Sequence, residues 1–187
     1  YDNIFMWQVE NEPMYPFGNC QKQTKETVEK EVAVVRKIDN RPIMIQDSGE
    51  GGFWRPNYLL GDYLGISMYR RTWYNFYKEI TGISFYFNYP LAHWTYKIKA
   101  VLTGVPVDKI IVTELQGEPW GPVINSKLTE EEKQKNMSKQ QFLETISYAQ
   151  KSGFKDLYFW GAEWWLWEKE VNNKPFYWET AKAVIQN

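Results

Sequence analysis

Short apolar runs alternate with helical patterns along most of the chain, and this alternation limits the fold more than any other feature of the sequence. The clearest run, Lys109–Thr113, is an almost continuous series of β-branched residues, which is typical of a parallel strand covered on both faces. Further strands are predicted at Ile4–Val9, Ile43–Ile45, Leu64–Met68 and Asp156–Trp160. Because alternating strands and helices build right-handed βαβ units, the sequence predicts an α/β fold with a parallel sheet.

Capping signals place the helices between these strands. Thr24 precedes an amphipathic pattern, and Thr129 and Ser138 each open a capping box. Helices are therefore predicted over residues 24–38, 92–103 and 176–185, and after Thr129 and Ser138. The segment from Tyr69 to about Pro90 is expected to be a long aromatic loop.

Two architectures fit this order of elements. An open doubly wound sheet has a glycine-rich turn after its first strand, whereas here the first turn, Glu10–Pro13, is acidic. A complete (β/α)₈ barrel needs about 250 residues, and this chain has 187. We therefore predict a TIM (β/α)₈ barrel, of which residues 1–187 form a single domain covering about strands four to eight. Because a strand pattern begins at Ile4, we expect a fragment or a chain that lacks its N-terminal part.

Composition argues against several classes of function. The net charge of −1 offers no basic stripe for a nucleic acid, and no apolar run approaches the ~18 residues of a membrane span. A single cysteine, Cys20, and a single histidine, His93, disfavour a disulfide framework, a zinc site and a Ser-His-Asp triad. We expect no cofactor and no metal. Aromatic residues make up 18% of the chain, more than core filling requires, and exposed rings suit the apolar faces of sugars.

Acidic residues follow several of the predicted strands. Glu10 and Glu12 follow the first, Glu114 the fourth and Glu163 the fifth, and the carboxyl ends of the strands form the active face of a (β/α)₈ barrel. Each of them alone could equally be a helix-cap or solvated loop charge. Glu114 fits that alternative least, because it comes directly after the β-branched run. Two carboxylates on separate strands, among many tryptophans, suggest glycoside hydrolysis.

Several motifs add a family resemblance to this pattern. Trp7–Pro13 resembles the Asn-Glu-Pro signature on the fourth strand of clan A retaining glycoside hydrolases, such as the family 5 cellulases and mannanases. It is also similar to the matching strand of family 35 β-galactosidases. Ile111–Glu114 resembles their seventh strand, Ile66–Tyr69 the sixth and Tyr158–Gly161 the eighth. The resemblance implies the C-terminal half of such a barrel and a retaining mechanism on β-linked sugars.

The resemblance also implies roles for individual residues. Glu12 would be the general acid/base and Glu114 the nucleophile. Asn11 would bind the sugar 2-hydroxyl, Tyr69 would hold the Glu114 carboxylate, and Trp160 would form the floor of the subsite for the cleaved sugar. Glu12 would need a raised pKa to be protonated at working pH, and the negative charge of Glu114 would supply part of that rise.

The first three strands of such a barrel have no counterpart in this chain. We therefore expect a further N-terminal segment, or a second chain, to complete the barrel, since a five-strand piece would expose two edges. The rival functions are a non-catalytic carbohydrate-binding or pseudo-enzyme module and a half-barrel that assembles through its edges. Trp120, between Pro119 and Pro122, is the best candidate for a further sugar platform. Residues left open as alternatives are Glu118 and Glu163, both expected inside loops, as rival carboxylates, Asp47 and Glu50 as cleft-lining or turn residues, and Trp164, Trp165 and Trp167 as platforms or packing residues.

Overall fold

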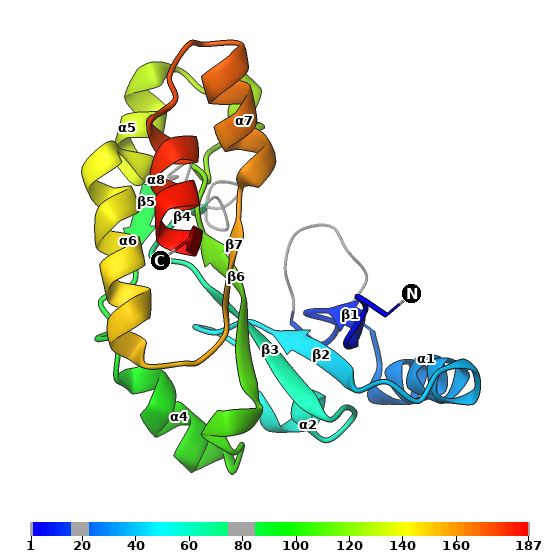
Figure 1. Cartoon of the computed structure of the whole chain (residues 1–187). Helices are drawn as coiled ribbons and strands as arrows, with labels where there is room; N and C mark the ends of the chain where they lie inside the picture. The colour runs from blue at the N-terminus through cyan, green and yellow to red at the C-terminus, as the bar shows by residue number, and fades with distance from the viewer. Residues whose placement is uncertain (1, 16–22, 75–84, 187) are drawn as a thin grey trace. The chain divides into compact units, whose positions relative to one another are not determined.

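The computed structural model describes residues 2–15, 23–74 and 85–186, and these form a mixed α/β fold (Figure 1). Among them, one five-stranded sheet has the order β1-β2-β3-β6-β7. Its strands are β1 (Trp7–Asn11), β2 (Ile43–Asp47), β3 (Tyr63–Met68), β6 (Ile110–Gln116) and β7 (Leu157–Trp160). Strand β2 pairs in parallel with both β1 and β3. The predicted α/β class with a mostly parallel sheet is confirmed.

Helices separate most of the strands, and a second, two-stranded sheet follows β3. The helices are α1 (Lys25–Ile38), α2 (Arg55–Tyr58), α4 (Thr95–Thr103), α5 (Glu130–Met137), α6 (Lys139–Ser152), α7 (Ala162–Glu170) and α8 (Phe176–Gln186). Two 3₁₀ turns are η1 (Val107–Lys109) and η2 (Asn125–Lys127), and the small sheet pairs β4 (Arg71–Tyr74) with β5 (Phe85–Asn88). No helix in the described ranges is long and apolar enough to cross a membrane.

Contacts divide the chain into two compact units. The first unit comprises Tyr1–Met68, Ala92–Glu114 and Lys151–Tyr158. The second unit comprises Tyr69–Leu91, Leu115–Gln150 and Phe159–Asn187. The prediction that residues 1–187 form a single domain stays a prediction.

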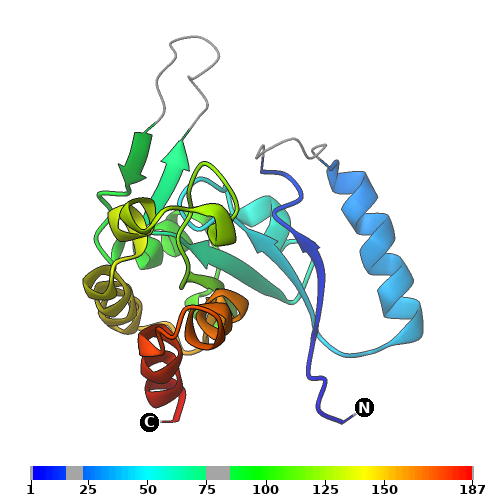
Figure 2. The same ribbon diagram turned by 90° about the horizontal axis from the view of Figure 1, so that it is seen from above.

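In the first unit, α1 lies beside β1 (Figure 2) and contributes to an apolar core beneath the sheet. The core consists of Val28, Ile43, Ile45 and Leu60. The N-cap of α1 is Thr24, whose side chain accepts a hydrogen bond from the Thr27 amide at 3.2 Å, as predicted. Every residue of β2 is buried, including the polar side chains of Gln46 and Asp47 at its carboxyl end.

The first strand differs from its prediction in both position and burial. The sequence predicts a buried strand at Ile4–Val9, whereas the strand is Trp7–Asn11 and its residues are exposed or only partly buried. Pairing begins where the Trp7 amide donates to the Pro42 carbonyl at 2.9 Å. In the described sheet β1 has a neighbouring strand on one side only. Trp7 is therefore 37% exposed, although the run from Ile4 to Val9 is largely apolar.

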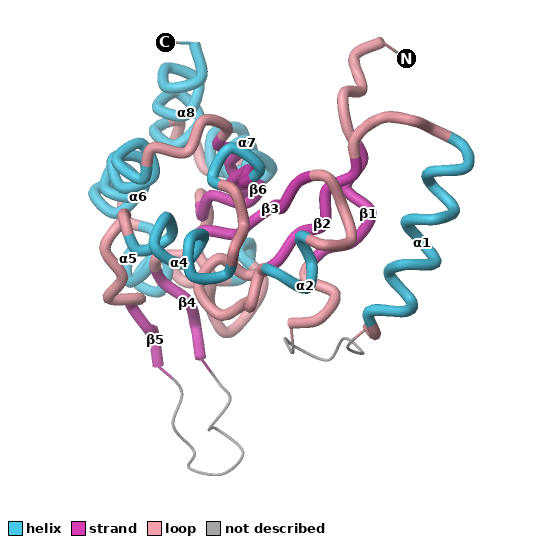
Figure 3. The backbone as a smooth tube through the Cα atoms, turned by 90° about the horizontal axis from the view of Figure 1, so that it is seen from below, coloured by secondary structure: helices cyan, strands magenta, loops and turns pink. Residues whose placement is uncertain are grey.

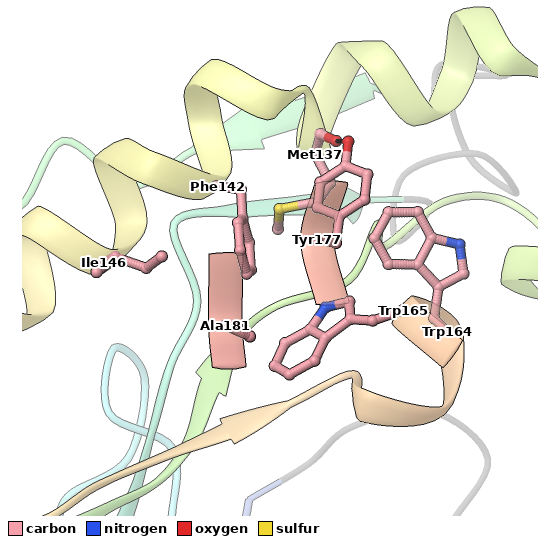
Figure 4. Close-up of a cluster of buried hydrophobic side chains, with 7 residues drawn as sticks. All are labelled: Met137, Phe142, Ile146, Trp164, Trp165, Tyr177 and Ala181. Atoms are coloured by element: carbon pink, nitrogen blue, oxygen red, sulfur yellow. Dashed lines mark hydrogen bonds between the residues drawn. The ribbon is translucent and has the colours of Figure 1, made fainter. Parts of the chain in front are cut away.

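The second unit has an aromatic core formed by α5, α6, α7 and α8 (Figure 4). Its buried residues are Met137, Phe142, Ile146, Trp164, Trp165, Tyr177 and Ala181. The ring of Phe142 contacts those of Trp165 and Tyr177 edge-on, with centroids 5.6 and 5.3 Å apart. Part of the aromatic excess is therefore used in packing, and of the two alternatives for Trp164 and Trp165, packing is correct.

The predicted aromatic loop from Tyr69 to Pro90 is wrong, because it contains an antiparallel strand pair (Figure 3). Aromatic residues face each other across β4 and β5. Trp73 contacts Tyr86 at a centroid distance of 4.7 Å, and Tyr74 stacks with Phe85 at 6.3 Å. Such cross-strand aromatic pairs stabilise a two-stranded sheet, and the density of rings concealed the alternation in the sequence.

The predicted capping boxes are confirmed. Thr129 Oγ1 accepts from the Glu132 amide, and the Glu132 carboxylate accepts from the Thr129 amide, at the start of α5. Ser138 and Gln141 exchange the same pair of bonds at the start of α6. Both patterns depend on neighbours three positions apart, which is why the sequence alone reveals them.

Candidate active site

Two carboxylates lie at the carboxyl ends of strands in the first unit. Glu12 comes directly after β1. Glu114 lies inside β6, which continues to Gln116, so the prediction that this residue follows the strand is wrong. Hydrogen bonding to the neighbouring strand continues beyond the β-branched run. The Gly117 amide, just after β6, still donates to the Trp160 carbonyl at 2.8 Å.

The backbone of Glu12 adopts an unusual conformation. Its φ of 50° lies in the left-handed region, which residues with a side chain rarely occupy. The Glu12 amide donates to the carbonyl of Gln46 at 3.1 Å, and the Glu12 carbonyl accepts from the Tyr15 amide at 3.0 Å. Non-glycine residues held in such conformations cost about 1–3 kcal/mol and are concentrated at functional sites.

A serine holds the Glu12 side chain. Ser67 Oγ donates to Glu12 Oε1 at 2.9 Å and accepts from the Gly49 amide at 3.2 Å. Ser67 is buried, and its bond with the Gly49 amide is buried with it, whereas its bond with Glu12 is partly buried. Gly49 approaches β3 closely, because a Cβ at this position would lie 1.8 Å from the Ser67 carbonyl oxygen.

The environment of Glu12 raises its pKa from an ordinary value of 4.5 to about 7. Burial is the largest cause, and the negative charges of Glu114 and Asp47 raise the pKa further, whereas the hydrogen bond from Ser67 lowers it. Asp47 also has a raised pKa, mainly because of burial, although it accepts bonds from the Trp54 and Ser48 amides. Glu12 is therefore poised to exchange a proton near neutral pH.

Gln46 connects the two glutamates. Its side-chain amide donates to Glu114 Oε1 at 2.7 Å, while its backbone carbonyl receives the Glu12 amide. Gln46 is 1% exposed, and its side-chain oxygen accepts from Gln8 Nε2 at 3.0 Å, which fixes the orientation of the amide. Gln8 Nε2 also lies 3.3 Å from Asn11 Oδ1. The structure thus brings Asn11, Glu12 and Glu114 into one hydrogen-bonded group.

The predicted aromatic site residues belong to the second unit. The rings of Tyr69 and Trp120 meet edge to face at a centroid distance of 5.6 Å. Trp160 is 47% exposed, and its indole nitrogen donates to Glu118 Oε1 at 3.1 Å. The predicted roles of Tyr69 toward Glu114, and of Trp120 and Trp160 toward a sugar, stay predictions.

The rival carboxylates have structural partners. Glu118 accepts the indole bond from Trp160, and Glu50 accepts from the Tyr96 hydroxyl at 2.5 Å. Glu163 lies in the first turn of α7 and not in a loop as predicted, and a negative charge is favoured there by the helix dipole. Glu10 lies within β1 and not after it, and burial together with the negative charge of Glu10 raises the pKa of Glu31.

Cys20 lies outside the described residues. His93 lies partly buried just before α4. Within residues 2–15, 23–74 and 85–186, no group of three or more His, Cys, Asp or Glu side chains could hold a metal ion.

Three residues that position the site, Gln8, Gln46 and Ser67, are not predicted by the sequence patterns. Gln46 follows the apolar run Ile43–Ile45, and Ser67 is the next-to-last residue of β3. A polar residue at the carboxyl end of a buried strand is the signal that would have identified both, because burial of such a side chain requires a partner.

No family model matches the sequence, and no curated protein matches it. Among solved structures, the chain is similar to an FMN-binding beta-glucuronidase from Facaelibacterium prausnitzii L2-6, with a TM-score of 0.43 and 14% identity. The likeness covers 84% of this chain and 22% of that chain, so this chain spans about a fifth of the length of that protein.

Proposed function

We propose that the chain is the part of a retaining glycoside hydrolase that carries both catalytic carboxylates, and that it acts on β-linked oligo- or polysaccharides. One arrangement carries the proposal: Gln46 accepts from the Glu12 amide and donates to the Glu114 carboxylate, and Ser67 holds the Glu12 side chain, where burial and the charge of Glu114 raise the pKa of Glu12 to about 7. A proton donor beside an oriented carboxylate is the pair that double displacement requires.

In this proposal the reaction proceeds in two steps. Protonated Glu12 gives its proton to the glycosidic oxygen while a Glu114 oxygen attacks the anomeric carbon, so that the sugar forms an ester with Glu114 and the leaving group departs as an alcohol. Ionised Glu12 then takes a proton from water, whose oxygen attacks the same carbon and releases Glu114. Asn11, which shares Gln8 with Gln46, would bind the 2-hydroxyl of the sugar.

We further propose that the sheet is part of a (β/α)₈ barrel. The five strands lie in the sheet in the order in which they occur in the chain, as in a barrel, whereas a doubly wound sheet reverses order at a switch point. In the described sheet, β1 offers an unpaired edge, next to which Phe5 is 61% exposed. A preceding segment or a second chain would cover this edge. Sedimentation tests the second-chain version, which a lone 22.3 kDa particle would contradict.

Hydrolysis of a panel of 4-nitrophenyl β-glycosides tests the catalytic assignment. Glu114→Gln is expected to reduce turnover of every responsive substrate by at least about a hundredfold. Glu12→Gln is expected to affect the nitrophenyl substrates less than unactivated disaccharides, since a good leaving group needs little protonation. The matched control is Glu163→Gln, an exposed carboxylate on α7. Undiminished hydrolysis by Glu114→Gln would overturn the assignment.

A sugar-binding module without catalysis is the second candidate. The observation favouring it is that Trp160, in the second unit, is 47% exposed, with its indole nitrogen held by Glu118, so this unit presents an oriented ring to solvent. Calorimetric titration with β-linked oligosaccharides separates the two functions. Binding without turnover by the wild-type chain, and unchanged binding by Glu114→Gln, would favour this module over the hydrolase.

A further inference from the structure

A polar cavity of about 270 Å³ lies within the second unit. Its walls come from β4, β5, the end of β6 and the helices α5 and α6. The residues that matter for its chemistry are Arg70, Arg71, Gln116, Asn136, Glu144 and Thr145. The volume is slightly below the range of about 300–1,000 Å³ that is typical of drug-sized ligands, so the cavity suits a single small ring and not an extended chain.

Asn136, one of the residues that line the cavity, carries an unsatisfied acceptor. The residue is 1% exposed, and its Nδ2 donates to the Trp120 carbonyl. That bond fixes the orientation of the amide, and Oδ1 is left buried with no hydrogen-bond partner. A buried acceptor without a partner costs about 1–3 kcal/mol, which a ligand hydroxyl would offset by donating to it.

The two arginines are held in place by other residues of the same unit. Gln116, which is fully buried, accepts through Oε1 from the Arg70 and Arg71 amides at 2.9 and 3.0 Å and donates through Nε2 to the Arg71 carbonyl at 2.6 Å. The Arg70 guanidinium lies 3.9 Å above the Tyr148 ring. Arg71 Nη1 donates to the Lys135 carbonyl at 2.9 Å. Both cations are therefore preorganised before any ligand arrives.

Neither guanidinium has a carboxylate within ion-pair distance in the described part of the chain. Each one has five N–H donors, and the bonds described for Arg70 and Arg71 go to neutral carbonyls. The charged groups in the wall are these two arginines and Glu144, which lies at the exposed edge. The net charge of the lining is thus +1, which is balanced by a monoanion such as a carboxylate and not by a dianionic phosphate.

From this combination we propose that the cavity binds a sugar acid, a single pyranose ring that carries one carboxylate. The carboxylate pairs with Arg71 and Arg70, and ring hydroxyls donate to Asn136 Oδ1 and bond to the Thr145 hydroxyl. A simple carboxylate would leave the Asn136 acceptor unpaired, and a neutral sugar would leave the two cations unpaired. The site is independent of hydrolysis by Glu12 and Glu114, so the proposal stands or falls separately from the proposed function.

Titration of the whole chain with D-galacturonate, D-galactose and galactose 6-phosphate tests this proposal, using calorimetry for affinity and the Asn136 side-chain amide signal in ¹H–¹⁵N spectra for location. Galacturonate is expected to bind at least about tenfold more tightly than galactose, because a charge-assisted bidentate bond is lost in the neutral sugar. It is also expected to bind more tightly than the phosphate.

Two variants change the charge of the lining in opposite directions. Arg71→Gln is expected to weaken galacturonate binding about tenfold, and Glu144→Gln to strengthen it a few-fold, while Glu163→Gln, outside the cavity, leaves it unchanged. Glu144 is exposed, so its variant tests the charge argument even where Arg71→Gln fails to fold. Equal affinity for galactose, preference for the phosphate, an unmoved Asn136 signal, or weaker binding by Glu144→Gln would each overturn the proposal.

Discussion

Glu12→Gln is expected to stabilise the protein above neutral pH and to leave its stability nearly unchanged in acid. The folded state raises the pKa of Glu12 from 4.5 to about 7. Below pH 4.5 the carboxyl is protonated in both the folded and the unfolded chain. Between pH 4.5 and 7 the unfolded chain releases this proton and the folded chain keeps it, so the free energy of unfolding falls as pH rises. Above pH 7 the whole cost is present.

The magnitude follows from the shift in pKa. A rise from 4.5 to about 7 corresponds to about 3 kcal/mol, which the ionised carboxylate costs the folded state at pH 8. Glutamine cannot ionise, and its amide oxygen can still accept from Ser67, so the variant avoids this cost. The left-handed backbone at position 12 is present in both proteins, and its strain cancels in the comparison.

Urea denaturation followed by tryptophan fluorescence, at intervals from pH 4 to pH 8, measures the effect. The difference between Glu12→Gln and wild type is expected to grow from near zero at pH 4 to about 3 kcal/mol at pH 8. Glu163→Gln, whose carboxylate is exposed on α7, is the matched control and is expected to show no such growth. A difference that is the same at every pH would refute the reasoning, because it would mean that the burial of Glu12 does not alter its protonation.

Three further predictions concern residues that surround Glu12 and Glu114. Glu114→Gln is expected to lower the pKa of Glu12 but to keep it above 4.5, because burial, the largest cause of the raised value, remains. Carbon NMR titration of the Glu12 carboxyl measures this pKa. An unchanged value would show that the two charges do not interact. Gln46→Leu is expected to reduce kcat/KM for nitrophenyl glycosides about tenfold or more, because the bond that orients Glu114 is lost. Circular dichroism is the control that the variant keeps its fold. Wild-type kinetics would contradict the role of Gln46. Gly49→Ala is expected to cost about 1–3 kcal/mol in urea denaturation, because its Cβ would meet the Ser67 carbonyl oxygen at 1.8 Å, and a neutral result would mean that this loop moves freely.

The sequence predicts those elements whose causes are local. The N-cap at Thr24 and the capping box from Thr129 to Glu132 involve neighbours three positions apart, and both are present. The aromatic strands β4 and β5 were predicted as a loop, since their stability comes from cross-strand pairs such as Trp73 with Tyr86. Pairs of this kind are separated in sequence and leave no periodic signal within one strand.

For the site, the sequence predicted the two glutamates and not the residues that hold them. Glu12 and Glu114 are conspicuous because a charge next to an apolar run needs a reason. Gln46 forms its bond with Glu114 across 68 positions of sequence, and Ser67 reaches Glu12 across 55. Such polar pairs become visible only when the strand order is known, because burial and not spacing selects them.

The position of Gln46 in the sheet explains how one residue supports both glutamates. Strand β2 lies next to β1, so the Gln46 carbonyl can accept from the amide of Glu12 just beyond the end of β1. Strand β3 separates β2 from β6, and the β3 residue paired with Gln46 is Gly65. A Cβ at Gly65 would lie 3.1 Å from Met44 Sδ and 3.0 Å from Thr113 Oγ1, so the glycine leaves room for side chains of β2 and β6 over β3. A shift of β2 along its neighbours would move the Gln46 carbonyl away from the Glu12 amide and the Gln46 side-chain amide away from Glu114, so both contacts depend on the register of this strand.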